Sequence, residues 1–140
     1  MNYLLDTNVV SELVKPRPNE RVVRWIAEVD EDRTFLSVMT FTEIRQGIEQ
    51  LGLGPRREAL RKWIDEDVPE RFAGRIMPVD LRTADACGVL LAQSRKNGMG
   101  LGVVDALFAA SALANQMTLV TRNTRHFAQT GVELHDPWTG

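Results

Sequence analysis

Three carboxylates in this chain of 140 residues stand where structure alone explains them poorly. Asp105 lies within the apolar run Val103–Ala110, where an isolated ionised carboxylate is costly unless a cation or strong donors offset it. Asp6 ends the first apolar run, and Glu43 borders an apolar stripe with Gly47 one helical turn later. A set of carboxylate oxygens without thiolates or paired imidazoles favours binding of Mg²⁺ or Mn²⁺ over zinc or copper. Such an ion activates water and offsets charge on phosphate, so phosphodiester hydrolysis is the chemistry that these residues indicate.

Each of these carboxylates also has a purely structural explanation. Asp6 and Asp105 could each cap the helix that follows, and Glu43 could be a solvated residue on a helix flank. Thr121 and Asn123 follow another apolar run and could form only a turn. In an open parallel sheet, however, ligands collect at the carboxyl ends of the strands, so two polar clusters at such ends predict one shared site.

Short apolar segments alternate with helical patterns along the chain. Strands are predicted at residues 3–5, 34–38, 75–79, 118–120 and 132–134. Helices are predicted near 20–29, from 40 to about 51, at 55–67, from 80 or 83 to about 97, and at 104–115. The alternation is typical of βαβ units and predicts one α/β domain, spanning residues 1–140, with a parallel sheet covered on both faces.

Composition narrows the function classes. Apolar residues make up 44% of the chain, which is enough for one core. Cys87 is the only cysteine and no Cys/His cluster exists, which excludes an internal disulfide and a thiolate zinc site and fits a reducing compartment. The N-terminus has no basic and apolar leader pattern, and no apolar run approaches the roughly 20 residues that span a bilayer. We therefore expect a cytoplasmic protein without a membrane partner.

The net charge of −2 argues against a general DNA-binding protein. Contact with nucleic acid would have to rely on a local basic patch. The candidates for phosphate contacts are Arg45, Lys96, Arg122 and Arg125.

Four motifs, in this order, resemble those of PIN-domain proteins, and most closely the VapC-like toxins of the FitB-type subgroup. The motifs are Leu4–Asn8, Thr42–Ile48, Val104–Ala110 and Thr121–Asn123. The resemblance covers essentially the whole chain, and four ordered motifs are specific where one alone would be weak. It implies a three-layer α/β/α fold, a metal-dependent endoribonuclease and a homodimer. It also implies neutralisation by a cognate antitoxin, with a hetero-oligomer of the two on operator DNA.

The resemblance also assigns roles within the site. Asp6, Glu43 and Asp105 correspond to the carboxylates that hold Mg²⁺ or Mn²⁺, and Thr7 and Thr121 to residues that support them.

Two positions depart from the family pattern. Asn123 stands where many PIN domains have a fourth acidic residue, and it remains a candidate neutral ligand. His126 stands where related sequences often have Asp, and taken alone it is interpreted as a surface residue. Both departures lower the negative charge, so one ion is expected to bind well and a second poorly.

Two alternative functions come from other classes. A haloacid-dehalogenase-like phosphatase would use Asp6 as its nucleophile, but Asn8 stands where that motif has its second acidic residue. A non-catalytic PIN-fold interaction module is supported only by Asn123 and His126, and the three retained carboxylates argue against it. Gly98–Gly102 is glycine-rich like a dinucleotide-binding loop, but no strand precedes it, so it is interpreted as a linker.

Overall fold

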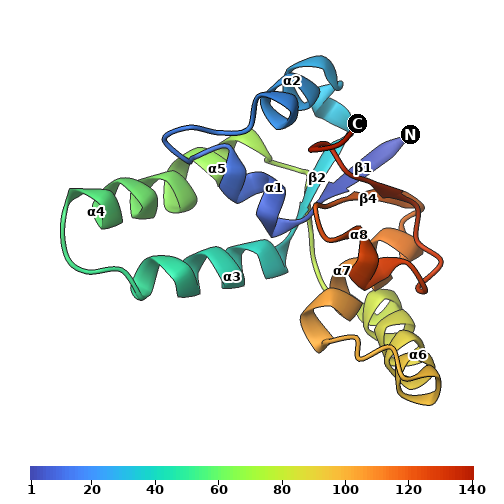
Figure 1. Cartoon of the computed structure of the whole chain (residues 1–140). Coiled ribbons are helices and arrows are strands. Elements are labelled where there is room, and N and C mark those ends of the chain that lie inside the picture. Colours follow the sequence, from blue (N-terminus) through green and yellow to red (C-terminus); the bar gives the residue numbers. More distant parts are fainter.

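The computed structural model describes all 140 residues. Its centre is a five-stranded sheet in the order β3-β2-β1-β4-β5, and every neighbouring pair is parallel (Figure 1). The strands are β1 (Asn2–Leu5), β2 (Thr34–Ser37), β3 (Ile76–Met77), β4 (Met117–Val120) and β5 (Leu134–His135). The first strand of the chain is therefore the middle strand of the sheet.

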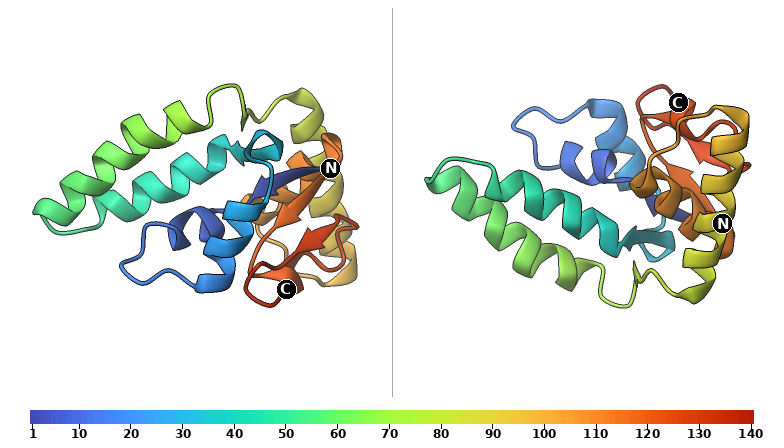
Figure 2. Two further views of the ribbon diagram at one scale, coloured as in Figure 1. Left: turned by 90° about the horizontal axis from the view of Figure 1, so that it is seen from above. Right: turned by 90° about the horizontal axis from the view of Figure 1, so that it is seen from below.

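Helices cover both faces of this sheet (Figure 2). They are α1 (Thr7–Glu12), α2 (Glu20–Glu28), α3 (Val38–Glu49), α4 (Pro55–Lys62), α5 (Val68–Arg71), α6 (Leu81–Asn97), α7 (Val103–Ala114) and α8 (Thr124–Phe127). A 3₁₀ turn at Glu31–Arg33 precedes β2, and a π-helical turn at Trp63–Asp67 joins α4 to α5. Helices α6 and α7 lie on one face, whereas α3 and α4 form a pair that projects from the other side.

Two apolar clusters lie on opposite faces of the sheet. Leu4 and Leu119 belong to one cluster with Phe108 of α7, and all three are fully buried. The next residue of each strand, Leu5 and Val120, belongs to the other cluster. Because successive strand side chains point to opposite faces, each central strand contributes to both clusters. The predicted three-layer α/β/α fold with a parallel sheet is confirmed.

Several element boundaries differ from the predicted ones. Helix α3 begins at Val38, two residues earlier than predicted, because the Ser37 hydroxyl accepts a hydrogen bond from the Met39 amide (3.0 Å) and caps the helix. The fifth strand is Leu134–His135, where it pairs with β4, and not 132–134. Helical structure after residue 55 continues through the π turn to Arg71. No helix of the structure is both long and apolar enough to cross a bilayer.

Candidate active site

Polar residues that follow the central strands meet at the carboxyl edge of the sheet. Asp6 directly follows β1, and its backbone amide still donates to the Val120 carbonyl of β4 (2.9 Å). Its side-chain Oδ1 accepts from the Thr7 amide (2.7 Å) and caps α1. Thr121 directly follows β4, and because Leu5 pairs with Val120, Thr121 lies beside Asp6. Because β1 ends at Leu5 and α1 begins at Thr7, the Asp6 carboxylate lies at the carboxyl edge of the sheet.

Asp6 is the most enclosed of the three carboxylates, with 6% of the residue exposed. Its Oδ2 accepts from the hydroxyl of Thr121 (2.8 Å) and lies 3.4 Å from the Asn8 amide nitrogen. Asn8 occupies the position where the phosphatase alternative would need a second acidic residue.

Burial raises the pKa of the Asp6 carboxyl from its ordinary 3.8 to about 6. The hydrogen bonds from Thr121 and Thr7 lower this pKa, whereas the charges of Glu43 and Asp105 raise it. Both other carboxylates are therefore close enough to repel Asp6. A bound cation would offset the repulsion among the three carboxylates.

Glu43 reaches the site from α3. The Thr7 hydroxyl donates to Glu43 Oε1 (2.6 Å), and the fully buried Thr40 hydroxyl lies 3.2 Å from the Thr7 hydroxyl. Thr7 therefore contacts Asp6 through its backbone amide and Glu43 through its side chain. It connects the first two carboxylates.

Asp105 lies in the first turn of α7, which begins after Gly102, so the N-cap explanation for Asp105 is wrong. Its carboxylate lies 3.5 Å from Nδ1 of His126 on α8, and the two side chains are 36% and 60% exposed. His126 is exposed, as the sequence suggested, but it faces the third carboxylate. The sequence signal for this contact is that His126 occupies a position where related sequences often have Asp.

Thr121 and Asn123 form more than a turn. The Thr121 side chain is fully buried, donates to Asp6 and accepts from the Asn123 amide (3.0 Å). Asn123 precedes α8, but its side chain makes no capping hydrogen bond and is exposed. Its amide oxygen is thus free to act as a neutral ligand.

The three carboxylates offer a divalent cation hard oxygen donors that no Lys or Arg occupies. No group of three or more His, Cys, Asp or Glu side chains lies close enough together to form a preformed metal site. None of the three carboxylates has a Lys or Arg within ion-pair distance, and only Asp105 has a His, His126, within that distance. The chemistry of the set, hard oxygens with uncompensated negative charge, fits a hard divalent cation.

A groove of about 320 Å³ opens beside the site, between α1, α3 and α4. Thr7 and Glu43 line one part of it, and Gly47 lies on its α3 wall. A Cβ atom at Gly47 would meet nothing within 4 Å, so this glycine widens the groove and relieves no clash.

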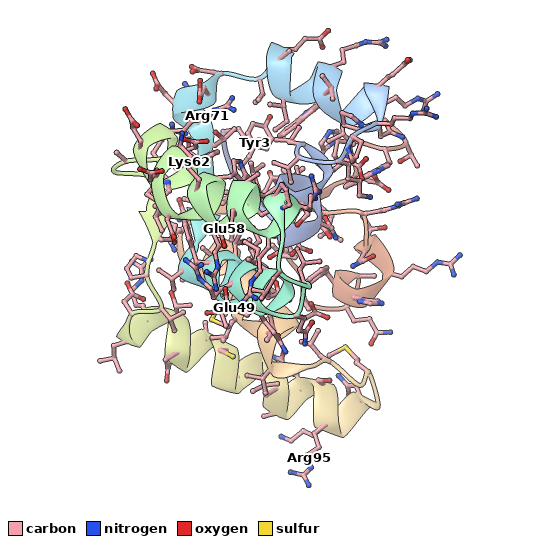
Figure 3. The ribbon with its side chains drawn as sticks, turned by 90° about the vertical axis from the view of Figure 1, so that its left-hand side faces the viewer. Tyr3, Glu49, Glu58, Lys62, Arg71 and Arg95 are labelled. Atoms are coloured by element: carbon pink, nitrogen blue, oxygen red, sulfur yellow. The ribbon has the colours of Figure 1, made fainter.

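The four basic candidates fall into different environments. Arg45 forms an ion pair with Asp65, so its charge is already offset. Lys96 lies in the last turn of α6, the end that carries the projecting Arg95 in Figure 3. Arg122 and Arg125 flank Asn123, are exposed and have no carboxylate within ion-pair distance.

Comparison with known proteins decides the family. The family profile described as PIN domain matches residues 3–133. The chain belongs to the PIN-domain family. This PIN domain is 34% identical over 135 residues to Toxin FitB of Neisseria gonorrhoeae, covering 96% of the chain and 97% of that protein. It is also 34% identical over 135 residues to VapC ribonuclease Y4jK of Sinorhizobium fredii, covering 96% of both.

A solved structure, titled "Structure of FitAB bound to IR36 DNA fragment", resembles this PIN domain with a TM-score of 0.91 at 34% identity. The similarity covers 97% of this chain and 95% of that one. The resemblance drawn from the four sequence motifs is confirmed.

The raised pKa of Asp6 gives this PIN domain a testable pH signature. Between pH 4 and 6 the native state holds a proton that the unfolded chain has released, so Asp6 contributes less to stability as pH rises through this window. Above pH 6 the full cost of burying its charge is present. Without metal, Asp6→Asn should therefore raise the free energy of unfolding by about 2 kcal/mol at pH 7, allowing for a lost hydrogen bond.

The gain should shrink as pH falls toward 4, which urea titrations of both proteins would measure. Carboxylates that do not interact with Asp6 cancel in the difference between the two proteins. An equal gain at both pH values would contradict the account of Asp6.

Proposed function

We propose that this PIN domain is a divalent-metal-dependent endoribonuclease and the toxin of a toxin–antitoxin pair. The observation that carries the proposal is the buried Asp6 carboxyl, whose pKa the charges of Glu43 and Asp105 help to raise at the carboxyl edge of the sheet. The names of the relatives, a toxin and a VapC ribonuclease, support the same activity.

Asp6, Glu43 and Asp105 would hold Mg²⁺ or Mn²⁺. When bound, the ion supplies a water of lowered pKa and charge compensation for the scissile phosphate. The protein keeps the ligands in place: Thr7 orients Glu43, and Thr121 orients Asp6.

Arg122 and Arg125 are proposed to bind RNA phosphates beside this site, with smaller contributions from Arg45 and Lys96. The partner is proposed to be a cognate antitoxin, and the assembly a homodimer that joins the antitoxin on operator DNA. The solved structure of FitAB bound to a DNA fragment supports the complex with an antitoxin on DNA, whereas the homodimer rests on the family resemblance alone.

The activity can be tested with metal-stripped protein given an RNA of mixed sequence or a small aryl phosphate. We expect RNA cleavage with Mg²⁺ or Mn²⁺, loss of cleavage with a chelator, and no aryl phosphate hydrolysis. Hydrolysis of the aryl phosphate alone would favour the phosphatase alternative. No reaction on either substrate, with any metal, would indicate a non-catalytic module and overturn the proposal.

The salt dependence of RNA binding separates the basic candidates. Each phosphate contact to single-stranded RNA contributes about 0.7 to the slope of log affinity against log salt. Arg125→Ala should lower the slope by about this amount. Arg45→Ala is the matched control and should lower it less, because Asp65 already pairs with Arg45. Equal slopes in wild type and Arg125→Ala would show that RNA does not contact α8.

A further inference from the structure

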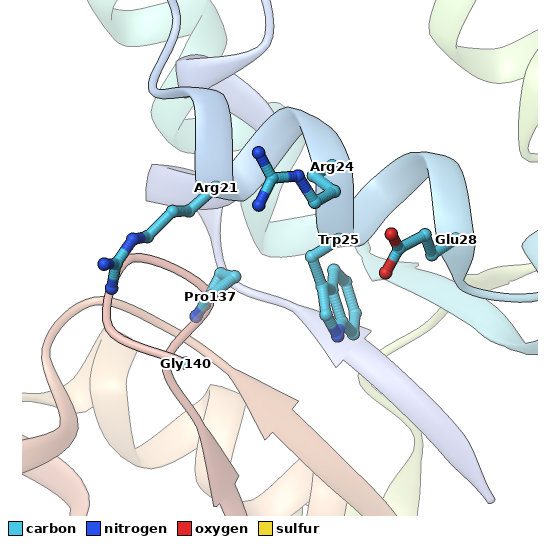
Figure 4. Close-up of a pocket in the computed structure, with 6 residues that line it drawn as sticks. All are labelled: Arg21, Arg24, Trp25, Glu28, Pro137 and Gly140. Atoms are coloured by element: carbon cyan, nitrogen blue, oxygen red, sulfur yellow. The ribbon is translucent and has the colours of Figure 1, made fainter.

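A basic hollow lies between α2 and the C-terminal turn of the chain. It measures about 300 Å³ (Figure 4). Figures 1 and 2 show α2 and the C-terminus side by side. Its lining residues are Arg21, Arg24, Trp25, Glu28, Pro137 and Gly140.

The two arginines of the hollow, Arg21 and Arg24, form no ion pairs. Most arginines near α3 to α5, by contrast, are paired with a carboxylate. Arg57 and Arg61, for example, both bind Glu49. Arg21 instead donates from Nη1 to the carbonyls of Trp138 (3.5 Å) and Thr139 (3.3 Å). No carboxylate, the C-terminal one included, lies within ion-pair distance of either side chain. Their charge is available to an anion.

Trp25 gives the hollow a fixed aromatic wall. Its ring packs edge-on against Tyr3, with 5.3 Å between the ring centroids. The His135 ring packs on it at 5.2 Å with a tilt of 35°. A half-buried indole held from two sides loses little conformational freedom when a planar group packs on it. Glu28 lies on the other side of Trp25 from Arg21 in Figure 4, and it disfavours a second phosphate there.

A continuous set of contacts joins the hollow to the active site. The Arg122 backbone amide lies 3.4 Å from Asn8 Oδ1, beside Asp6. The Arg122 guanidinium lies 5.3 Å from the centre of the Trp138 ring. The carbonyl of Trp138 in turn accepts from Arg21. Asn8, Arg122 and Trp138 thus connect the carboxylates to the hollow.

We propose that this hollow is a subsite for single-stranded RNA flanking the scissile bond, in which Arg21 and Arg24 bind one backbone phosphate and a neighbouring base packs against Trp25. Arginine–phosphate contacts combined with aromatic packing are how proteins track single strands without reading sequence. The subsite rests on the proposed ribonuclease function and extends its substrate to several nucleotides on the α2 side of the cut.

The test uses Arg24→Gln, because the Arg24 side chain forms no ion pair whose loss would disturb the fold. The matched control is Arg95→Gln, an unpaired arginine at the projecting end of α6 (Figure 3). For a single-stranded RNA of about twenty nucleotides, Arg24→Gln should raise KM about fivefold with kcat unchanged. For an RNA of three or four nucleotides around the same cut, KM should not change. Arg95→Gln should match the wild type on both.

An unchanged KM on the long RNA, or an equal rise on both RNAs, would overturn the subsite. Fluorescence anisotropy with the long RNA and no metal measures the same contact without catalysis. If the wild type binds RNA but never cuts it, the proposed function fails while the binding comparison still decides the subsite. Equal affinities of wild type and Arg24→Gln in that assay would reject the subsite alone.

Discussion

Asp105→Asn should lower the rate of RNA cleavage at saturating RNA and a fixed metal concentration by roughly a thousandfold. The amide keeps the shape of the side chain but removes one of three negative charges that would hold the ion. It also removes the negative charge that faces His126. Because Asp105 does not cap α7, the helix keeps its N-terminal geometry in the variant.

The matched control is Asp85→Asn, which makes the same substitution at an exposed position of α6. It should cleave RNA at the wild-type rate. Both variants should melt within a few degrees of the wild type. An Asp105→Asn protein with full activity would remove this residue from the site.

The second large effect concerns a second metal ion. Two divalent ions about 3.5–4 Å apart repel each other strongly, and three carboxylates cannot neutralise four positive charges. Asn123 is exposed and its amide is free, so it offers an oxygen without charge. Calorimetric titration with Mn²⁺ should therefore show one site of appreciable affinity in the RNA-free protein. Asn123→Asp should strengthen a second site by about tenfold or more.

Asn97→Asp, at the end of α6, adds the same charge away from the site and should leave the titration unchanged. His126→Asp should act like Asn123→Asp, since it places a carboxylate opposite Asp105. Two equally tight sites in the unmodified protein would contradict this account of the two departures.

The main features of the site could be predicted because they depend on local patterns. An apolar run that ends in Asp6, and another that ends in Thr121, predict two strand ends, and parallel pairing brings such ends to one edge. The register of β1 with β4 then places the Thr121 hydroxyl against Asp6.

Other features depend on long-range contacts that no local pattern encodes. The ion pair of Arg45 depends on how α3 packs against the π-helical turn after α4. The facing of His126 and Asp105 depends on the position of α8 over α7. The basic hollow could not be predicted for the same reason, because its walls lie more than a hundred residues apart in the sequence.

The most direct test of the central claim is the position of Mn²⁺, located by its anomalous X-ray scattering in crystals of the antitoxin-free protein. The account predicts one strong peak bounded by carboxylate oxygens of Asp6, Glu43 and Asp105. Manganese bound elsewhere, or no peak among these three residues in a preparation that cleaves RNA with Mn²⁺, would contradict it.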